Sequence, residues 1–316
     1  MNRAYRTALA ISLASVLLSV ILSACGGSDG AATPQAAAAA SSSPTSSSSS
    51  SASSSVSSGT SGSSSSSSSS SAPAGSAKAG YDLVFDEEFD SLSVSAWGPG
   101  TTWIAHTPWN GDFGDATFAN PTTGFPFTTT NGILSIEALK DASGNWQSGL
   151  LASVDANGDG FAQQYGYWEM RAKLPPGPGV WPAFWLDSLV PAGSTDPSYE
   201  VDALEYYGQF NSAYNASIHI WPKDGSTATT TTQTVSVTPD ALTSDYHVYG
   251  VSVEADWTIF YLDGTEMWRV ATPASHTHKL MILVDLALGG GWPITDTPSP
   301  SYMNVDYIRA YKLTGT

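Results

Sequence analysis

The chain has 316 residues, and 28 acidic residues outnumber 11 Lys and Arg residues, so its formal net charge is -17. Binding nucleic acid needs clustered Lys and Arg, so this balance excludes nucleic acid as a partner and argues against adhesion to anionic lipid. The single cysteine excludes an internal disulfide and a thiolate metal site. We expect an uncharged partner.

The first 25 residues have the pattern of an export signal. Arg3 and Arg6 precede the apolar run Ala8–Leu22, which at about 15 residues is short for a membrane span. The Leu-Ser-Ala-Cys segment ending at Cys25 resembles the lipobox of bacterial lipoproteins, in which the cysteine is lipidated and becomes the new N-terminus. An ordinary cleaved signal peptide is the alternative. The resemblance implies an exported lipoprotein of the outer membrane or cell surface.

Residues 26–79 form a second region, rich in serine and alanine. Between Ser41 and Ser71, serine occupies 24 of 31 positions and no residue is charged or aromatic. Such a stretch cannot bury enough apolar surface to offset its chain entropy, so we expect a disordered linker. Residues 80–316 then form one domain, which is long enough for a substantial core.

The sequence of this domain is typical of an all-β protein. Gly-, Asn- and Pro-rich turns separate short β-prone runs, and no long stretch shows the 3.6-residue period of a helix. Asp263-Gly264 between two such runs predicts a hairpin. These features predict a sandwich or barrel with strands at Ile133–Leu139, Gly166–Lys173, Val180–Leu186, Glu200–Tyr206, Ala216–Trp221, His247–Glu254, Trp257–Leu262, Lys279–Leu288 and Val305–Lys312.

One of these strands has an unusual aromatic pattern. With a period of two, Trp181, Ala183 and Trp185 share one face, and Phe184 and Leu186 share the other. If the second face packs in the core, the first presents two indoles separated by a small residue, an arrangement that suits stacking on sugar rings. Packing of both tryptophans between two sheets is the alternative.

Three carboxylates, Glu200, Asp202 and Glu205, fall within the following predicted strand. On a regular strand Glu205 would point away from the other two. A β-bulge near Ala203 and Leu204 restores the parity and places all three on one face. The outer carboxyls would then lie about 5 Å apart, the separation of a retaining glycoside hydrolase. A solvated acidic strand is the alternative, which repulsion between like charges disfavours.

Several motifs together make the sequence resemble glycoside hydrolase family 16. That family folds as a β-jelly-roll sandwich of the concanavalin A-like type with a concave substrate cleft. The Glu-x-Asp-x-x-Glu motif has the family's bulged form, whereas the lichenase branch has one residue fewer. The ordered matches are Phe85–Asp90, Tyr165–Pro175, Gly179–Leu186, Glu200–Glu205, Leu286–Gly290 and Val305–Tyr311.

The resemblance implies a retaining, endo-acting β-glycosidase that hydrolyses a β-glucan-type polysaccharide. The linkages would be β-1,3 or mixed β-1,3-1,4, and a bacterial exopolysaccharide is one candidate substrate. Glu200 would be the nucleophile, Glu205 the general acid/base and Asp202 the residue that orients Glu200. Because Glu200 must be ionised while Glu205 holds a proton, we expect their environments to separate their pKa values.

Other functions remain open alternatives to this interpretation. An endo-galactanase or a transglycosylase of the same family would carry the same motif. A catalytically silent jelly-roll protein that binds carbohydrate would keep the tryptophans but would not need three acids.

The resemblance and the strand pattern assign further residues to substrate binding. For His219 a structural role is the alternative, and for Arg171 an ion pair with Glu169. The assigned residues are Trp181 and Trp185 as stacking platforms, Arg171, His219 and Trp221 on strands, and Asn110 and Trp292 in loops at the rims.

No cofactor is expected for catalysis. The resemblance implies a possible structural calcium on the convex face, bound by Asp306 together with the backbone carbonyls of Glu88 and Gly132. A polysaccharide is the expected partner of a monomeric protein, which would contact the membrane only through the lipid at Cys25.

Overall fold

A computed structural model describes residues 79–315. The expected signal peptide, Cys25 and the linker up to residue 78 lie outside the described residues. Within 79–315 the regular structure is β-strand apart from one short helix, α2 (Ala241–Ser244), so the all-β prediction is confirmed. No helix in this part of the chain is long and apolar enough to cross a membrane.

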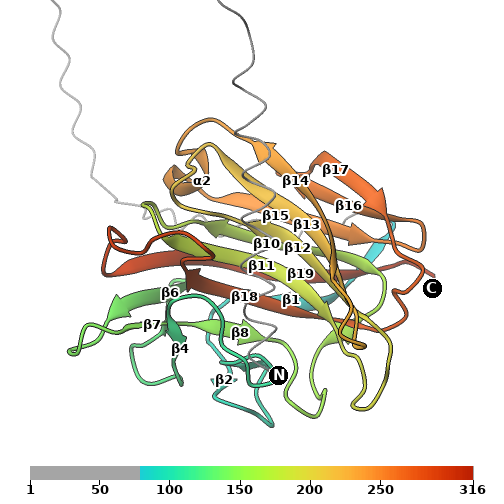
Figure 1. Ribbon diagram of the computed structural model, residues 1–316, viewed down its shortest axis with the longest axis horizontal. Helices are drawn as coiled ribbons and strands as arrows, with labels where there is room; N and C mark the ends of the chain where they lie inside the picture. Colours follow the sequence, from blue (N-terminus) through green and yellow to red (C-terminus); the bar gives the residue numbers. More distant parts are fainter. Residues whose placement is uncertain (1–78, 316) are drawn as a thin grey trace, which may run out of the picture. The chain divides into compact units, whose positions relative to one another are not determined.

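The strands form two large, mainly antiparallel sheets (Figure 1). The ten-stranded sheet runs β17 (Thr265–Ala271), β16 (Trp257–Leu262), β15 (His247–Val253), β10 (Gly166–Lys173), β19 (Ser301–Leu313), β6 (Ile133–Lys140), β7 (Trp146–Ser148) and β4 (Thr117–Phe118), with β1 (Tyr81–Glu87) on β19 and β5 (Phe127–Thr130) on β6. The nine-stranded sheet runs β14 (Thr229–Ser236), β13 (Ala213–Trp221), β12 (Ser198–Glu205), β11 (Val180–Ser188), β18 (Leu280–Leu288), β8 (Leu150–Ala152), β3 (Trp103–Ile104) and β2 (Val94–Ser95), with β9 (Ala162–Gln163) on β18.

All nine predicted strands are present, with ends that differ by up to four residues. The predicted hairpin is also confirmed, because β16 and β17 are joined by Asp263 and Gly264. Both residues have positive φ, 49° and 76°, as a two-residue turn between twisted strands requires.

The main core lies between the two sheets. It contains Trp168 and Met170 from the ten-stranded sheet and Phe184, Leu186 and Val284 from the nine-stranded sheet. Because side chains alternate along a strand, the residues between these positions point outward. Each sheet therefore has an outer face, and the two outer faces lie on opposite sides of the sandwich.

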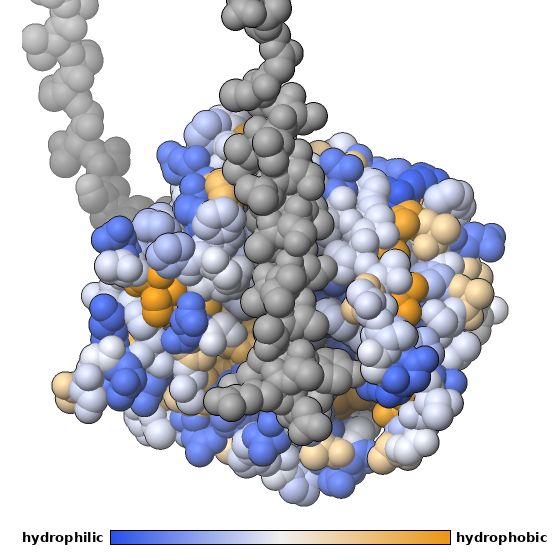
Figure 2. Space-filling view, viewed as in Figure 1, coloured by the Kyte–Doolittle hydropathy of each residue, from blue (hydrophilic) through white to orange (hydrophobic). Residues whose placement is uncertain are grey.

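A second apolar cluster covers the outer face of the nine-stranded sheet. Its members include Trp181 and Trp185 of β11 and Leu283 of β18. Elsewhere on the surface, as far as Figure 2 shows it, apolar residues occur in small patches between hydrophilic ones. The large apolar cluster on one outer face therefore marks that side of the sandwich as the place to look for a site.

Candidate active site

Strand β12 carries the three predicted carboxylates, and an irregularity in its pairing places them on one side. Its register against β11 pairs Glu205 with Ala183, Asp202 with Trp185 and Glu200 with Asp187. Between Leu204 and Asp202 the register skips Ala203, so the predicted β-bulge is confirmed.

The three acids therefore share the outer face of the nine-stranded sheet, since directly paired residues point to the same side. Two further acids point the same way. Asp187 is paired with Glu200, and Asp285 of β18 is paired with Ala183. We call this surface the acidic face.

Glu200 lies at one end of the group, beside two rings of β13. Trp221 Nε1 donates a hydrogen bond of 3.1 Å to Glu200 Oε2, and His219 Nε2 lies 3.8 Å from Oε1. Burial raises the pKa of Glu200 well above its usual range; repulsion from Asp202 adds to this effect, and His219 opposes it. These two rings hold the carboxylate in place and favour its charged form.

His219 connects the acids to the edge strand β14. Its Nε2 lies 2.9 Å from Asp202 Oδ2, its Nδ1 lies 2.8 Å from Thr230 Oγ1, and its ring stacks on Trp221. Burial alone would lower the pKa of the imidazole, but the hydrogen bond to Asp202 and the nearby acids outweigh burial and raise it to about 9. His219 is therefore cationic at neutral pH. Both rings contact the acids, and their binding to substrate stays a prediction.

Glu205 lies at the other end of the group and is held through one oxygen. Its Oε1 accepts hydrogen bonds from Trp181 Nε1 at 3.1 Å and from the Tyr207 hydroxyl at 2.7 Å. Oε2 is buried, and among the described residues it has no hydrogen-bond partner. Burial first, and then repulsion from Asp202, raise the pKa of Glu205 to about 7. Glu205 can therefore hold a proton on Oε2 near neutral pH.

The structure raises the pKa of both glutamates, whereas the sequence predicted that only Glu205 would keep its proton. The reason is that both carboxyls are buried beside Asp202, which a strand pattern does not reveal. Acids coupled in this way titrate as a group. Their partners still distinguish them, because Glu200 lies beside the cationic His219, while Glu205 has one buried oxygen that accepts no hydrogen bond.

The predicted alternation along β11 is confirmed. Phe184 and Leu186 belong to the core between the sheets, whereas Trp181, Ala183 and Trp185 belong to the cluster on the acidic face. Because this alternation sets Trp181 and Trp185 beside the acids, the alternative that both tryptophans pack between the sheets is wrong.

The two tryptophans are nevertheless well covered, each with 6% of its surface exposed. Phe113 packs edge-on against both rings, at centroid distances of 5.6 and 5.9 Å. Each indole N–H binds an acid, since Trp181 donates to Glu205 and Trp185 donates to Asp285 at 2.9 Å. These tryptophans therefore position carboxyls, and their stacking on sugar rings stays a prediction.

The two predicted rim residues lie in loops beside the apolar cluster of the acidic face. Asn110 is exposed and follows Trp109, whose ring packs edge-on against Trp185 at 6.3 Å. Trp292 follows β18 and packs edge-on against Phe210 at 4.9 Å. Sequence analysis missed Trp109, although an aromatic residue beside a Gly-rich turn was a visible signal.

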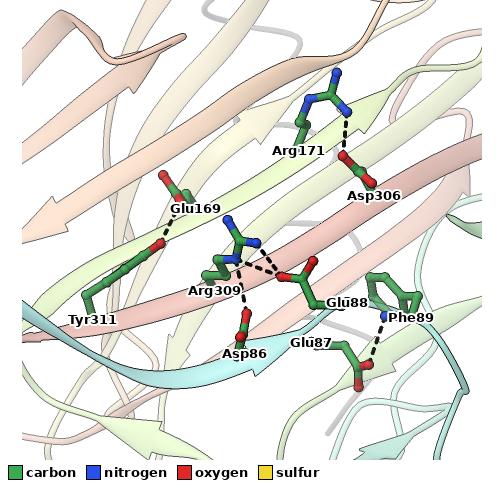
Figure 3. Close-up of polar contacts among 9 residues, drawn as sticks. All are labelled: Asp86, Glu87, Glu88, Phe89, Glu169, Arg171, Asp306, Arg309 and Tyr311. Atoms are coloured by element: carbon green, nitrogen blue, oxygen red, sulfur yellow. Dashed lines mark hydrogen bonds and ion pairs between the residues drawn. The ribbon is translucent and has the colours of Figure 1, made fainter. Parts of the chain in front are cut away.

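Arg171 lies away from this site. It lies on β10, where its neighbour Met170 faces the core, so the arginine points outward from the ten-stranded sheet. There it pairs with Asp306, while Glu169 accepts a hydrogen bond from Tyr311 at 2.9 Å (Figure 3). The prediction that Arg171 binds substrate beside the acids is wrong, and its alternative pairing with Glu169 is not formed. The alternation of residues along a strand shows which side chains share a face, but it does not show to which sheet the strand belongs.

The three predicted calcium ligands belong to the side of the ten-stranded sheet. Gly132 lies near the Glu88 carbonyl, since a Cβ built on Gly132 would be 3.5 Å from that oxygen. Asp306 binds the guanidinium of Arg171 (Figure 3). A calcium ion at Asp306 would be repelled by this positive charge. This ion pair argues against the calcium assignment, which stays a prediction.

A metal also fits poorly among the catalytic candidates. Glu200, Asp202 and His219 each offer an atom, and these atoms lie within 4.8 Å of one another. His219 directs Nε2 at Asp202 and has its pKa raised to about 9, so a metal ion would have to displace its proton and break this ion pair. The cluster is better described as an ion-paired acid group.

Two acids of the acidic face were missed from the sequence. Asp187 accepts hydrogen bonds from the Ser198 hydroxyl and the Ser188 N–H, and burial raises its pKa to about 6. Asp285 is fully buried and sits in the apolar run Leu280–Leu288. A single charged residue inside an apolar run was a signal that the sequence offered, because burial of a carboxylate costs free energy unless specific partners bind it.

Comparison with known proteins identifies the family. Residues 119–309, more than half of the chain, match the Glycosyl hydrolases family 16. The chain belongs to this family. The predicted resemblance is therefore confirmed, and the acid group of this family 16 member coincides with the matched region.

Curated relatives of this family 16 protein include two endo-1,3-1,4-beta-glycanases of Rhizobium meliloti (strain 1021), ExsH and EglC. Each is 32% identical, over 72% of this chain and 51% of the relative. Glucan endo-1,3-beta-glucosidase A1 of Niallia circulans is 29% identical over 76% of this chain and 39% of its own. The chain thus spans about half the length, or less, of these relatives.

Solved structures share the fold at lower identity. A laminarinase from Flavobacterium sp. UMI-01 matches with a TM-score of 0.59 at 23% identity, covering 73% of this chain and 100% of the other. The laminarinase catalytic domain from Thermotoga maritima MSB8 matches with a TM-score of 0.56 at 23% identity, covering 73% and 98%. The predicted jelly-roll sandwich is therefore confirmed.

Proposed function

We propose that this family 16 member is a retaining, endo-acting β-glycosidase that hydrolyses a β-glucan-type polysaccharide with β-1,3 or mixed β-1,3-1,4 linkages. The observation that carries the proposal is the different surroundings of two carboxyls. Glu200, beside the cationic His219, suits a nucleophile, and Glu205, with a buried and unbonded Oε2, suits a proton donor. Asp202 lies between them in the strand and pairs with His219.

The reaction would proceed in two displacements. Glu205 donates its proton to the glycosidic oxygen, and the C–O bond breaks while Glu200 attacks the anomeric carbon and forms a glycosyl ester. The Glu205 carboxylate then accepts a proton from water, whose oxygen attacks the same carbon and releases Glu200. Two inversions leave the anomeric configuration unchanged. Carboxyls and water suffice, so the reaction needs no cofactor.

Charge on the acidic face would change in step with the chemistry. When Glu200 becomes an ester it loses its negative charge, so less repulsion acts on Glu205. The pKa of Glu205 then falls, and Glu205 becomes ready to act as a base. His219, cationic beside Asp202, pairs with that aspartate in both steps.

The same charges support an uncharged substrate. In the strands that the structure describes, the nine-stranded sheet has five carboxylates and no Lys or Arg. A polyanionic chain would meet an excess of negative charge there and would be repelled. This disfavours sulfated galactans. The activity of the Rhizobium meliloti relatives, endo-1,3-1,4-beta-glycanase, supports the mixed linkages, and that of the Niallia circulans relative, glucan endo-1,3-beta-glucosidase, supports a glucan.

Uncharged β-1,3 and mixed-linkage β-1,3-1,4 glucans provide the test. The wild-type protein should release oligosaccharides, and proton NMR should show the β-anomer first. Glu200→Gln should abolish release while the circular dichroism spectrum stays unchanged. Release of the α-anomer first would contradict the retaining mechanism. An active Glu200→Gln variant would contradict the assignment of Glu200 as the nucleophile. Products longer than the substrate, detected by mass spectrometry, would indicate a transglycosylase.

We also propose that the protein acts as a monomer at the outer membrane or cell surface, anchored by lipid at Cys25. The support is the signal-like sequence that ends at this cysteine. Cys25→Ser should move the protein from the membrane fraction to a soluble or unprocessed form. Unchanged membrane association of the variant would contradict a lipid anchor.

A further inference from the structure

Asp285 is a buried acid that the two-glutamate reaction does not use. It is paired with Ala183 of β11, and Ala183 is paired on its other side with Glu205, so one small residue separates the two acids across the sheet. On β18, its neighbours on the same face are Leu283 and Ala287, both apolar. Asp285 itself has no exposed surface. A carboxyl in this position is costly unless specific partners hold it.

Each oxygen of Asp285 accepts one hydrogen bond. Oδ1 accepts from the Ala287 backbone N–H at 3.0 Å, and Oδ2 accepts from Trp185 Nε1 at 2.9 Å. Both partners can only donate, so both oxygens must accept. Asparagine has one oxygen and would turn its NH2 group toward one of these donors, and a protonated carboxyl would weaken one of the two bonds. These two hydrogen bonds therefore favour the ionised form of the aspartate.

We propose that Asp285 is a positioning residue for the acid/base Glu205, acting through its own negative charge, which the N–H of Trp185 stabilises. This inference rests on the proposed function. Asp285 fixes the indole of Trp185, which is directly paired with Asp202 on the acidic face. Its charge also disfavours a second charge on Glu205, and so keeps Glu205 in the protonated form that the first displacement needs.

The titration of Asp285 is consistent with this role. Burial raises the pKa of Asp285 to about 7 and Asp202 and Glu205 also raise it, whereas the two hydrogen bonds lower it. The charge is therefore present above about pH 7, where Glu205 loses its proton, and it is lost as the pH falls. Strands β8 and β9, as described, add no titratable group beside it. The other titratable groups of the acidic face are Asp187 on β11, Glu200, Asp202 and Glu205 on β12, His219 on β13 and Tyr207, whose hydroxyl donates to Glu205.

The test is the pH dependence of kcat/KM in the full-length protein with Asp285→Asn. Without the charge on residue 285, the pKa of Glu205 falls, so the alkaline limb of the profile should move to lower pH by about 0.5–1 unit. Trp185→Phe should move it in the same direction, because Asp285 then loses a donor and is more readily protonated. The double variant should shift no further than either single variant, since both act on one group.

Asp187→Asn provides the matched control. Asp187 is also buried on the acidic face, but it is paired with Glu200, so its neutralisation should move the acid limb and leave the alkaline limb in place. A lower rate in Asp285→Asn and Trp185→Phe with an unshifted alkaline limb would overturn the proposal and leave a packing role. An equal alkaline shift in Asp187→Asn would overturn it too. The proposed function is tested separately: it would be contradicted if the Glu200→Gln variant still hydrolysed the polysaccharide.

Discussion

The two outer faces of the sandwich differ in whether their charged side chains are paired with opposite charges. On the ten-stranded sheet, Arg171 and Arg309 are each paired with carboxylates, Arg309 with both Asp86 and Glu88. On the nine-stranded sheet, five acids share one face with a single imidazole, and the described strands contain no Lys or Arg. One face compensates its charges, and the other leaves acids in excess.

Because of this difference, we expect one outer face to contribute mainly to stability and the other mainly to catalysis. A buried acid without a counter-charge costs stability, because burial favours its neutral form. On the acidic face, burial of Glu205 lowers the stability of the fold. The same burial raises the pKa of Glu205, and a proton donor needs a raised pKa. We therefore expect substitutions on the acidic face to affect activity, and substitutions in the core or on the opposite face to affect stability.

The largest expected effect is on the acidic face. Glu205→Ala removes the group that protonates the leaving oxygen, so hydrolysis of polymer should fall by about 10²–10⁴-fold. Activated aryl glycosides, which leave without full protonation, should lose less, and added azide should restore part of the rate. Steady-state kinetics on both substrate types measure the contrast. Equal losses without azide rescue would contradict Glu205 as acid/base.

Neighbouring positions of β11 sharpen the comparison. Phe184→Ala opens a cavity between the sheets and should lower the free energy of unfolding by about 3–5 kcal/mol. Trp181→Phe keeps an aromatic ring but removes the N–H that binds Glu205, so it should reduce kcat about tenfold with a small change in stability. Urea denaturation and kinetics separate the two effects, and the reverse pattern would show that the faces are assigned the wrong way round.

On the opposite face, Arg171→Met should break the ion pair with Asp306. Because Asp306 is mostly buried while Arg171 is about one-third exposed, the expected loss of stability is only about 1–2 kcal/mol. The variant should keep its kcat/KM, since Arg171 lies on the other sheet. A large drop in kcat/KM at unchanged stability would place Arg171 in the substrate site after all.

The smallest expected effect concerns the predicted calcium. Since Arg171 already neutralises Asp306, neither EDTA nor added calcium should shift the Tm of the wild-type protein. In Arg171→Met the aspartate is released, and calcium could then stabilise the protein. A wild-type Tm that rises by several degrees with calcium would show that calcium binds in spite of Arg171.

Alternating patterns made the long strands and the three acids predictable. The bulge could be inferred because Glu205 was out of phase with Glu200, and a chemical reason required them on one face. Strand β14 was missed because its run of threonines is polar on both faces and shows no alternation. For the same reason Thr230, which binds His219, was not foreseen.

Other parts of the site could not be predicted because they depend on long-range pairing. The link between Asp285 and Glu205 passes through three strands, and its residues lie as many as 102 positions apart, from Ala183 to Asp285. The burial that raises the pKa of Glu200 depends on the packing of β13 against β12. Arg171 was misplaced because the sequence did not show which sheet contains β10.

The bulge at Ala203 makes the acid motif tolerant of one particular deletion. Without Ala203, β12 would read Glu-Val-Asp-Leu-Glu, and simple alternation would keep the three acids outward and Val201 and Leu204 inward. Deletion of Val201 would instead put Glu200 and Asp202 on opposite faces. An evolving gene could therefore lose one codon between Asp202 and Glu205, but not the codon between Glu200 and Asp202, and keep the three acids on one face.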